Sequence, residues 1–390
     1  MNVQEIQEAL RRSGLDGWLF FDHHQRDPLA YRVLAFQPPR LPTRRWYYLV
    51  PASGEPLGLA HRIEADMLGA LPGKKLFYAS WQEQRDGLRA LLAGRRRVAM
   101  QYSPECAVPY VAMVDAGTVE LVRSCGVEVV SSADLIQYFE ARWTPRQLEW
   151  HLEAGRRVDE ILRYAFRFIA ELLRGGQPVS EYDVKRYILN SFSRAGLYTD
   201  HGPIVAVNAH SSNPHYEPSV EHHAPIRKGD FVLIDLWAKI HEPEAVYYDI
   251  TWTGYCGADP KPELARVFEV VRDARDAAVR RVQQAVEAGE DLRGYQVDDV
   301  ARSYIAAQGY AAYFTHRTGH SIGMDVHGAG ANMDNFETHD ERRIIPWTCF
   351  SIEPGVYLPQ FGVRSEVNVF VGERKAIVTG EMQQELVRIE

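Results

Sequence analysis

Four acidic residues and one histidine in the second half of the chain could bind metal ions together. They are Asp235, Asp249, His320, Glu353 and Glu366, and each falls in a short segment typical of a buried strand or a strand end. A lone carboxylate is costly to bury in an apolar run such as FVLID or CFSIEP. Carboxylate oxygens and an imidazole nitrogen are common metal ligands, and this many donors would suit two divalent cations. The set therefore predicts metal-assisted hydrolysis.

Each of these segments also has an interpretation without metal. Asp235 could cap a turn at the end of its strand, and Asp249, placed mid-strand against its propensity, could belong to a buried hydrogen-bond network. Glu366, also expected mid-strand, could form a surface pair with Arg364, two residues earlier on the same face. The two aspartates lie on strands that could form a hairpin, which would project them toward each other. Five candidate ligands in strand contexts together favour a metal centre.

The segment HRTGHSIGMDVHG carries three histidines, His316, His320 and His327, among glycines. A lone histidine is more often structural, but neutral imidazole is a common ligand and glycines let the backbone pass close to a site. Three histidines in such a segment therefore support a functional site. Their spacing differs from HExxH, so a mononuclear zinc protease of that kind is not indicated.

The bulk composition limits the class of protein and its partners. A chain of 390 residues exceeds what one hydrophobic core usually supports, so we expect two domains. The net charge of −8, without a dense basic cluster, argues against nucleic acid as a partner. No apolar run approaches the roughly 20 residues that span a bilayer, which argues against a membrane protein. The four cysteines form no CxxC pair, which favours free thiols in a cytoplasmic protein.

Strand-like and helix-like segments alternate in residues 1–143, which predicts a small α/β domain with a mixed sheet. The predicted strands there are 17–21, 45–50, 76–79, 97–102 and 127–132, with helices at 82–92 and 118–124. From 144 to 390 the pattern changes to long amphipathic helices followed by strands, and it occurs twice. The predicted helices are 147–173, 180–193, 262–288 and 297–308, and the strands are 203–208, 231–238, 246–255, 348–353 and 366–371. We therefore expect a pseudo-twofold α+β domain with helices outside a curved antiparallel sheet.

Six motifs resemble the pita-bread metallopeptidases, the creatinase/aminopeptidase-like family that includes methionine aminopeptidase, aminopeptidase P and prolidase. They are IDLWAK, YYDITWTG, GHSIGMDVHG, SIEPGVY, GVRSE and NPHYEPS, and they occur in the family's order from about residue 145 to the end. The first 143 residues are similar to the additional N-terminal domain of prolidase and aminopeptidase P. The resemblance therefore implies a pita-bread catalytic domain over 144–390, a metal-dependent exopeptidase and, by analogy with the family, a homodimer.

The resemblance also implies roles for individual residues. The metal ligands would be Asp235, Asp249, His320, Glu353 and Glu366, with Asp249 and Glu366 shared between two divalent cations and a hydroxide bridging them. Glu353 would be the general base, and His327 would donate to the scissile carbonyl oxygen. The residues implied in substrate binding are His215, His316, His339 and Arg364. Mn²⁺ is our first expectation because oxygen donors dominate the set, and Zn²⁺ and Co²⁺ are alternatives.

Some positions depart from the family pattern. The two aspartates are separated by an insertion, IHEPEAVY, and Trp237 stands where a glycine is typical. His339 replaces an arginine usual in prolidases, and His201 replaces a tyrosine. We expect an Xaa-Pro dipeptidase (a prolidase), whose N-terminal domain would restrict the cleft to dipeptides. The alternatives are an aminopeptidase P acting on longer peptides, a metal-independent creatine-hydrolysing relative, and a non-enzymatic binding module of the same fold.

Overall fold

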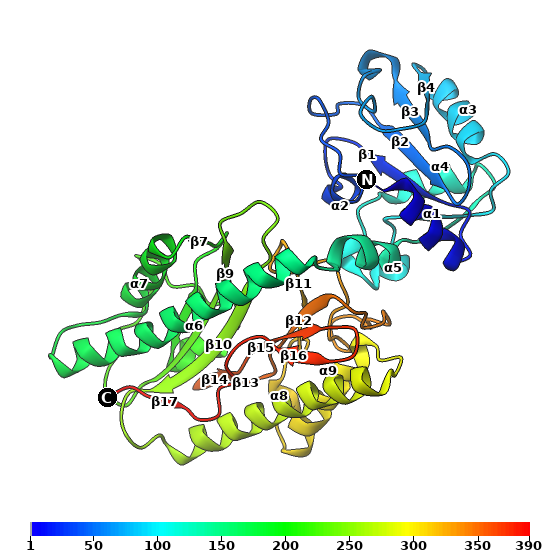
Figure 1. Ribbon diagram of the computed structural model, residues 1–390. Coiled ribbons are helices and arrows are strands. Elements are labelled where there is room, and N and C mark those ends of the chain that lie inside the picture. The colour runs from blue at the N-terminus through cyan, green and yellow to red at the C-terminus, as the bar shows by residue number, and fades with distance from the viewer. Residues whose placement is uncertain (1) are drawn as a thin grey trace. The chain divides into compact units, whose positions relative to one another are not determined.

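The computed structural model describes residues 2–390, which divide into two compact units, Met1–Glu140 and Ala141–Glu390 (Figure 1). Each unit is described by itself. Among the described residues, no helix combines the length and apolar character needed to cross a bilayer. The four cysteines are free thiols. Cys256 and Cys349 are buried as expected, whereas Cys106 is exposed.

The first unit is built on a six-stranded mixed sheet with the order β4-β3-β2-β1-β5-β6. Its strands are β1 (Gly17–Asp22), β2 (Trp46–Pro51), β3 (Leu57–His61), β4 (Lys74–Tyr78), β5 (Arg97–Met100) and β6 (Glu128–Ser131). Its helices are α1 (Val3–Arg12), α2 (Pro28–Val33), α3 (Trp81–Leu92), α4 (Ala116–Arg123) and α5 (Ala133–Ile136). The sequence predicted the mixed sheet but missed β3, a short segment in which Gly58 breaks the apolar run.

The second unit begins with a long helix, a shorter helix and strands, and this order then recurs. The first set is α6 (Pro145–Arg174), α7 (Glu181–Arg194), β7 (Leu197–Tyr198), β8 (Ile204–Val207), β9 (Phe231–Ile240) and β10 (Tyr248–Tyr255). The second set is α8 (Pro262–Ala288), α9 (Gly294–Ala307), β11 (Ser321–Ile322), β12 (Thr348–Ile352), β13 (Gly355–Leu358), β14 (Phe361–Arg364), β15 (Val367–Val371), β16 (Ala376–Val378) and β17 (Val387–Arg388).

The strands of the second unit form separate sheets instead of the single curved sheet predicted from the sequence. One sheet has the order β17-β10-β9-β7, with β8 also paired to β9, and another has the order β11-β12-β15-β16. The helices α6 and α7 share a hydrophobic core with β8, β9 and β10. The helices α8 and α9 share a core mainly with β12, β13, β14 and β15.

Local sequence signals account for where the first two helices of this unit begin. The side chains of Thr144 and Ser180 each accept a hydrogen bond from the backbone N–H of the third helical residue. In return, the side chains of Gln147 and Asp183 accept a hydrogen bond from the backbone N–H of the capping residue. These reciprocal capping boxes satisfy backbone groups that have no partner inside a helix. Helix α6 therefore starts at a fixed residue, and its apolar face is aligned with the sheet.

Helix α6 packs closely on β10 through Gly155. A Cβ atom at this position would lie 2.7 Å from Cε2 of Tyr248, whose ring is buried. The Tyr248 hydroxyl also donates to Oδ1 of Asp159 on the same helix, at 2.8 Å. The tyrosine ring is thus held against the helix immediately next to Asp249.

We expect Gly155→Ala to destabilise the protein, although alanine favours helices by about 1 kcal/mol over glycine. The added methyl group overpacks a fixed aromatic ring, which typically costs about 1–3 kcal/mol. Urea unfolding measures the change. Gly175→Ala is the control, because its Cβ would make no contact closer than 3.4 Å. A Gly155→Ala protein as stable as the wild type would contradict this account of the helix–strand packing.

Candidate metal centre

Asp235 and Asp249 lie on neighbouring antiparallel strands, β9 and β10. The register pairs Asp235 with Thr251 and Asp249 with Trp237. Residues two apart on a strand share a face, so the two aspartates are diagonal neighbours on one side of the sheet. Both are buried. Asp235 lies within β9, which continues to Ile240, so the alternative in which Asp235 caps a turn at the end of its strand is wrong.

Glu366 reaches this face from the second half of the unit. It precedes β15, so its predicted mid-strand position was also wrong. Its backbone N–H donates to the carbonyl oxygen of Thr251 at 3.2 Å, and the Thr251 hydroxyl donates to its Oε2 at 2.8 Å. The backbone N–H of Asp249 donates to Oδ1 of Asn368 at 3.0 Å. These bonds join β10 to the segment around β15 and hold Glu366 beside Asp249.

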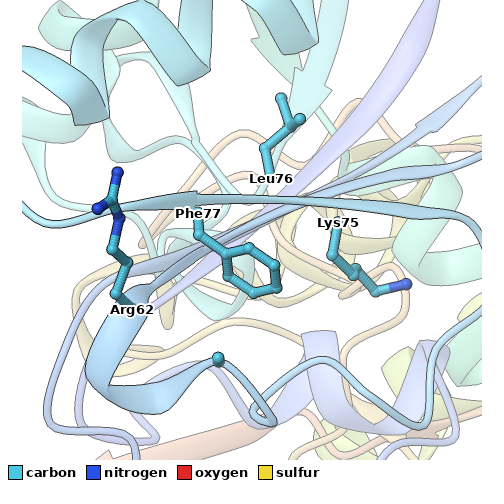
Figure 2. Close-up of a pocket in the computed structure, with 5 residues that line it drawn as sticks. Arg62, Lys75, Leu76 and Phe77 are labelled. Atoms are coloured by element: carbon cyan, nitrogen blue, oxygen red, sulfur yellow. The ribbon is translucent and has the colours of Figure 1, made fainter.

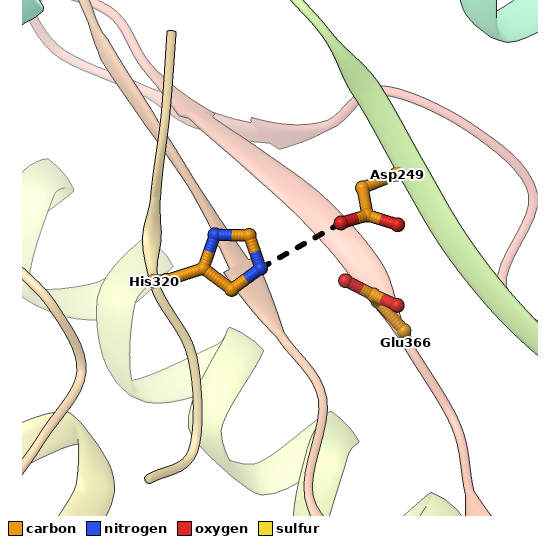
Figure 3. A group of neighbouring side chains, drawn as sticks. All are labelled: Asp249, His320 and Glu366. Carbon is orange, nitrogen blue, oxygen red and sulfur yellow. Dashed lines mark ion pairs between the residues drawn. The ribbon is translucent and has the colours of Figure 1, made fainter. Parts of the chain in front are cut away.

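A single serine positions the remaining two candidate ligands. The Ser351 hydroxyl accepts the backbone N–H of His320 at 2.9 Å and donates to Oε1 of Glu353 at 3.1 Å. Nε2 of His320 lies 3.3 Å from Oε1 of Glu353 and 3.6 Å from Oδ2 of Asp249. Figure 3 shows the imidazole facing the carboxylates of Asp249 and Glu366. All five residues predicted as ligands therefore surround one buried space.

The chemistry of His320 indicates that a cation belongs in this space. Burial, followed by the nearby His327, lowers the pKa of His320 well below its usual range, so the ring is neutral near pH 7. Nδ1 lies 3.2 Å from the carbonyl oxygen of Ser321, the geometry of a donated hydrogen bond. In that tautomer Nε2 directs a lone pair at the carboxylates of Asp249 and Glu353. Facing lone pairs repel unless a positive charge lies between them.

The hydrogen bonds of the carboxylates lead to the same result. Oδ1 of Asp235, Oδ1 of Asp249 and Oε1 of Glu366 are buried and have no hydrogen-bond partner within residues 2–390. Ligand atoms of Asp249, His320 and Glu366 all lie within 4.8 Å of one another. Buried acceptors without donors are rare in folded proteins because each one loses its hydration. Three such oxygens around one space fit divalent cations.

Mutual repulsion raises the proton affinity of these carboxyl groups. Burial is the largest cause for Asp249 and Glu366, whose pKa values rise well above the usual range, and each is raised further by neighbouring carboxylates. Burial raises the pKa of Glu353 to about 7, although Arg364 opposes the rise. Divalent cations would relieve the repulsion between these groups.

Arg364 is part of the same buried group and not of a surface pair with Glu366. It is 3% exposed, and its Nη2 donates to Oδ2 of Asp235. Its Nε donates to the Thr251 hydroxyl at 3.2 Å, and Nη1 donates to the Tyr357 hydroxyl at 3.1 Å. Nε2 of His316 lies 2.7 Å from the same Tyr357 hydroxyl. His316 and Arg364 are thus connected through one tyrosine.

The other predicted site residues lie at different distances from this group. The ring of His327 meets that of His320 edge-on, with centroids 4.3 Å apart. Burial, followed by the charges of Arg317 and His215, lowers the pKa of His327 to about 4. His215 is exposed, and the effect of its charge on the pKa of His327 indicates that the two residues lie near each other.

His339 makes its contacts elsewhere. Its Nδ1 lies 2.7 Å from Oδ1 of Asn335, its Nε2 lies 3.5 Å from Oε1 of Glu341, and its ring lies against Tyr295. In the described part of the chain, no hydrogen bond or ion pair joins it to the five candidate ligands. The structure therefore does not bring His339 into the ligand group.

Three positioning residues were missed in the sequence, namely Thr251, Ser351 and Asn368. Each lies two residues from a candidate ligand, at Asp249, Glu353 and Glu366 respectively. Because residues two apart on a strand share a face, the alternation could have identified Thr251 and Asn368 as neighbours of the site. Their hydroxyl and amide groups supply the bonds that fix the ligands.

The raised pKa of Glu353 gives a pH dependence for protein stripped of divalent cations with a chelator. A carboxyl group whose pKa is raised on folding binds its proton more tightly in the folded state, so stability is lost as the pH rises from about 4.5 to about 7. Glu353→Gln removes this loss. We expect the free energy of unfolding of Glu353→Gln to gain about 1–3 kcal/mol relative to wild type across that window.

Urea titrations at several pH values measure this difference, and comparing two stripped proteins cancels the opposite contribution of the buried histidines. Glu149→Gln, at a side chain that is 66% exposed, is the matched control, and its free energy of unfolding should depend on pH as that of the wild type does. If the free energy of unfolding of Glu353→Gln also had the same pH dependence as that of the wild type, the carboxylates would not repel one another as described.

Comparison with known proteins places the chain in a family. Residues 149–373 match the pattern of metallopeptidase family M24. An Xaa-Pro dipeptidase of Lactobacillus delbrueckii subsp. lactis is 32% identical over 237 residues, which cover 60% of this chain and 58% of the relative. A Mycoplasma pneumoniae protein provisionally named Xaa-Pro aminopeptidase is 30% identical over 224 residues, which cover 56% of this chain and 59% of the relative. The matched segments thus span about three fifths of each relative.

The fold is shared over nearly the whole chain. The structure of a prolidase from Thermococcus sibiricus aligns with a TM-score of 0.67 at 24% identity, covering 99% of this chain and 98% of that one. This likeness confirms the predicted pita-bread fold. With more than half of its length matched to the family pattern, the chain belongs to metallopeptidase family M24.

Proposed function

We propose that this protein is a metal-dependent Xaa-Pro dipeptidase, which hydrolyses the bond before proline in dipeptides. The observation that carries the proposal is the convergence of Asp249, His320 and Glu366, with buried carboxylate oxygens that have no hydrogen-bond partner among residues 2–390. Membership of the M24 family supports peptide hydrolysis. The dipeptidase relative from Lactobacillus delbrueckii supports proline specificity.

Two divalent cations are proposed to bind the five converging residues. Asp249 and Glu366 would be shared between the cations, Asp235 would complete one position, and His320 with Glu353 would complete the other. When bound, the cations would supply Lewis acidity, which lowers the pKa of a water molecule and polarises the scissile carbonyl. Mn²⁺ remains our first choice, because four of the five ligands are carboxylates, ahead of Zn²⁺ and Co²⁺.

The remaining chemistry falls to Glu353 and His327. Glu353 would accept the proton of the attacking water on a carboxylate oxygen and pass it to the departing proline nitrogen. Ser351 holds this carboxylate at 3.1 Å, which keeps it oriented during the transfer. His327 is neutral near pH 7, because burial lowers its pKa to about 4, and a neutral imidazole still has one N–H to donate. That N–H would stabilise the negative charge that develops on the carbonyl oxygen.

Substrate positioning is proposed for His215, His316, His339 and Arg364. His316 and Arg364 share the Tyr357 hydroxyl, which fixes the two side chains relative to each other. His339 would bind the carboxylate of the substrate when protonated, more weakly than a bidentate arginine. The partly buried Trp237 lies opposite Asp249 on the ligand-bearing face and donates to Oδ1 of Asp200 at 3.3 Å. Its indole offers an apolar surface to the substrate.

The proposal extends to the setting of the enzyme. Residues 1–143 would form the N-terminal domain and residues 144–390 the catalytic domain. We propose a cytoplasmic homodimer, in keeping with the composition and the family resemblance. The second candidate activity is that of aminopeptidase P, which the Mycoplasma relative's provisional name supports.

Hydrolysis of a matched substrate pair tests the proposed activity. The pair is an Xaa-Pro dipeptide and the same sequence extended by one residue, assayed with metal-stripped protein to which Mn²⁺ is returned. We expect cleavage of the dipeptide at a rate well above that of the tripeptide. Equal or faster cleavage of the tripeptide would favour aminopeptidase P. No cleavage of either peptide by protein that has bound metal would refute proline-specific hydrolysis.

The role of His327 can be tested separately. Loss of a hydrogen-bond donor to a developing oxyanion typically lowers kcat by about 10²–10³. We expect this loss in His327→Ala with little change in KM and an unchanged metal content. His241→Ala, which removes an exposed histidine stacked on Tyr198, is the control. A change confined to KM would assign His327 to substrate binding instead.

A further inference from the structure

The carboxyl ends of five strands, β1, β3, β4, β5 and β6, lie at one edge of the sheet in the first unit. β1 is parallel to β5, β3 is parallel to β4, and β2 runs antiparallel between β1 and β3. The chain crosses from β4 to the far side of β1 to form β5, so the strand order changes direction at this edge. Open α/β sheets commonly bind ligands outside the carboxyl ends of their strands at such a switch point.

A pocket of about 680 Å³ lies at this edge. It is lined by loops that follow β1, precede β2 and follow β3 and β4, and by the first turns of α3 and α4. Its lining includes Arg26, Arg44, Arg45, His23 and His61. Three arginines in one pocket are notable in a chain whose net charge is −8.

These arginines are only weakly neutralised. Arg44 donates to the carbonyl and hydroxyl oxygens of Thr43, at 3.1 and 3.2 Å, and Arg45 makes no side-chain hydrogen bond or ion pair within residues 2–390. Arg26 lies 3.8 Å from Oδ2 of Asp115, the one carboxylate in the lining. Burial is the largest cause that lowers the pKa of His23, and the positive charges of His24, Arg26 and Arg45 lower it further.

A second pocket in the same unit provides a contrast. It has a volume of about 460 Å³ and is lined by residues of β4 and by Arg62 and Ala65, as Figure 2 shows. Lys75 donates to three backbone carbonyl groups, and Arg62 pairs with Glu83 at 3.2 Å. Because both cations already have partners, this pocket has little charge to offer a ligand.

The first arginine-bearing loop is held in place by a buried carboxylate. Asp22 is 1% exposed and accepts hydrogen bonds from the backbone N–H groups of Gln25, Arg26 and Asp27 and from the Tyr31 hydroxyl. The loop also contains two consecutive non-glycine residues with positive φ, His24 at 64° and Gln25 at 56°. Such backbone strain persists only where surrounding bonds enforce it, and it is common at ligand sites.

The second arginine-bearing loop is held in the same way. Glu64 is buried and accepts hydrogen bonds from the Thr43 hydroxyl and from the backbone N–H groups of Thr43 and Arg44. The two loops are also joined, because the backbone N–H of His24 donates to the carbonyl oxygen of Pro42 at 3.0 Å. The arginines therefore project from a backbone that is already ordered, which reduces the entropy lost on binding.

The pocket also contains an exposed aromatic ring. Trp81, the first residue of α3, lines the pocket and is 61% exposed. The guanidinium carbon of Arg85 lies 5.2 Å from the ring centroid. An indole so exposed can stack with a planar ligand, and stacking of this kind binds any base with a π-face.

We infer that this pocket binds a small phosphate monoester attached to a flat ring, as in a nucleoside monophosphate. The guanidinium groups of Arg44 and Arg45 would bind the phosphate through paired N–H groups, and Trp81 would stack on the ring. A phosphate monoester carries a charge of about −1.5 to −2 at pH 7, which suits several arginines better than a single carboxylate does. The site is independent of the metal centre and of the proposed peptidase activity.

Calorimetric titration of the metal-loaded protein with AMP tests the inference. Adenosine, inorganic phosphate and citrate are titrated alongside it, so that ring, phosphate and carboxylate are examined separately. We expect AMP to bind most tightly, phosphate to bind more weakly and adenosine to show no measurable binding. Failure of AMP to bind the wild-type protein would overturn the inference, and citrate binding as tight as that of AMP would overturn the assignment to phosphate.

Variants locate the binding. Arg44→Ala with Arg45→Ala removes two exposed side chains and should weaken AMP binding at least about tenfold, because the charged hydrogen bonds to the phosphate are lost. Trp81→Ala should reduce the affinity for AMP to that for phosphate. The control is Arg95→Ala with Arg96→Ala, which removes the same charge at the opposite edge of the sheet, just before β5.

The melting temperature of each variant is measured with the titrations. A lysine pair at positions 44 and 45 (R44K, R45K) keeps the charge but loses the planar fork, and it should bind AMP with an intermediate affinity. Unchanged AMP affinity in the folded R44A/R45A protein would place the binding elsewhere, including at the metals, and would refute the site. Equal loss in the R95A/R96A control would show only a general effect of charge.

Discussion

Four carboxylates, three of them buried and that of Glu353 partly exposed, lie close together in the second unit, and their mutual repulsion is the constraint on which the surrounding structure depends. Burial alone disfavours each charge, and each neighbouring carboxylate adds to the cost. Thr251, Ser351 and Arg364 supply donors to some of the oxygens. Three oxygens remain without a donor inside the described chain. Such an arrangement is stable only if positive charge accompanies it. The packing that brings the carboxylates together therefore also creates the need for a cation.

The same constraint explains why the unit needs both of its halves. Asp235 and Asp249 come from the hairpin of β9 and β10, whereas His320, Glu353 and Glu366 come from segments around β11, β12 and β15. Each half has its own hydrophobic core with its own pair of helices. Neither half could complete the group alone. The hydrogen bonds that join Thr251 to Glu366 and Asp249 to Asn368 therefore connect two separately packed halves at the point where the ligands meet.

The residues that converge here could be identified in the sequence because their strongest signals are local. An aspartate inside an apolar strand is unusual wherever it occurs, and the helices around the site have clear periodicity and capping boxes, as α6 and α7 show. Strand β3 and the position of Glu366 were predicted wrongly, because short strands end where long-range pairing ends and not where propensity changes. The hydrogen-bond partners of Ser351 and Arg364 could not be predicted, since they lie on segments that only the folded chain brings together.

Hydrogen-bond accounting distinguishes two uses of buried carboxylates in this protein. In the second unit, oxygens of Asp235, Asp249 and Glu366 have no donor, so they remain able to bind cations. In the first unit, Asp22 and Glu64 accept hydrogen bonds from several N–H and O–H groups, and these bonds hold the loops in place. Those loops then present arginines, which attract anions. The same residue type would thus form the proposed cation site where its oxygens have no donor, and it supports the loops of the proposed anion site where its oxygens accept several hydrogen bonds.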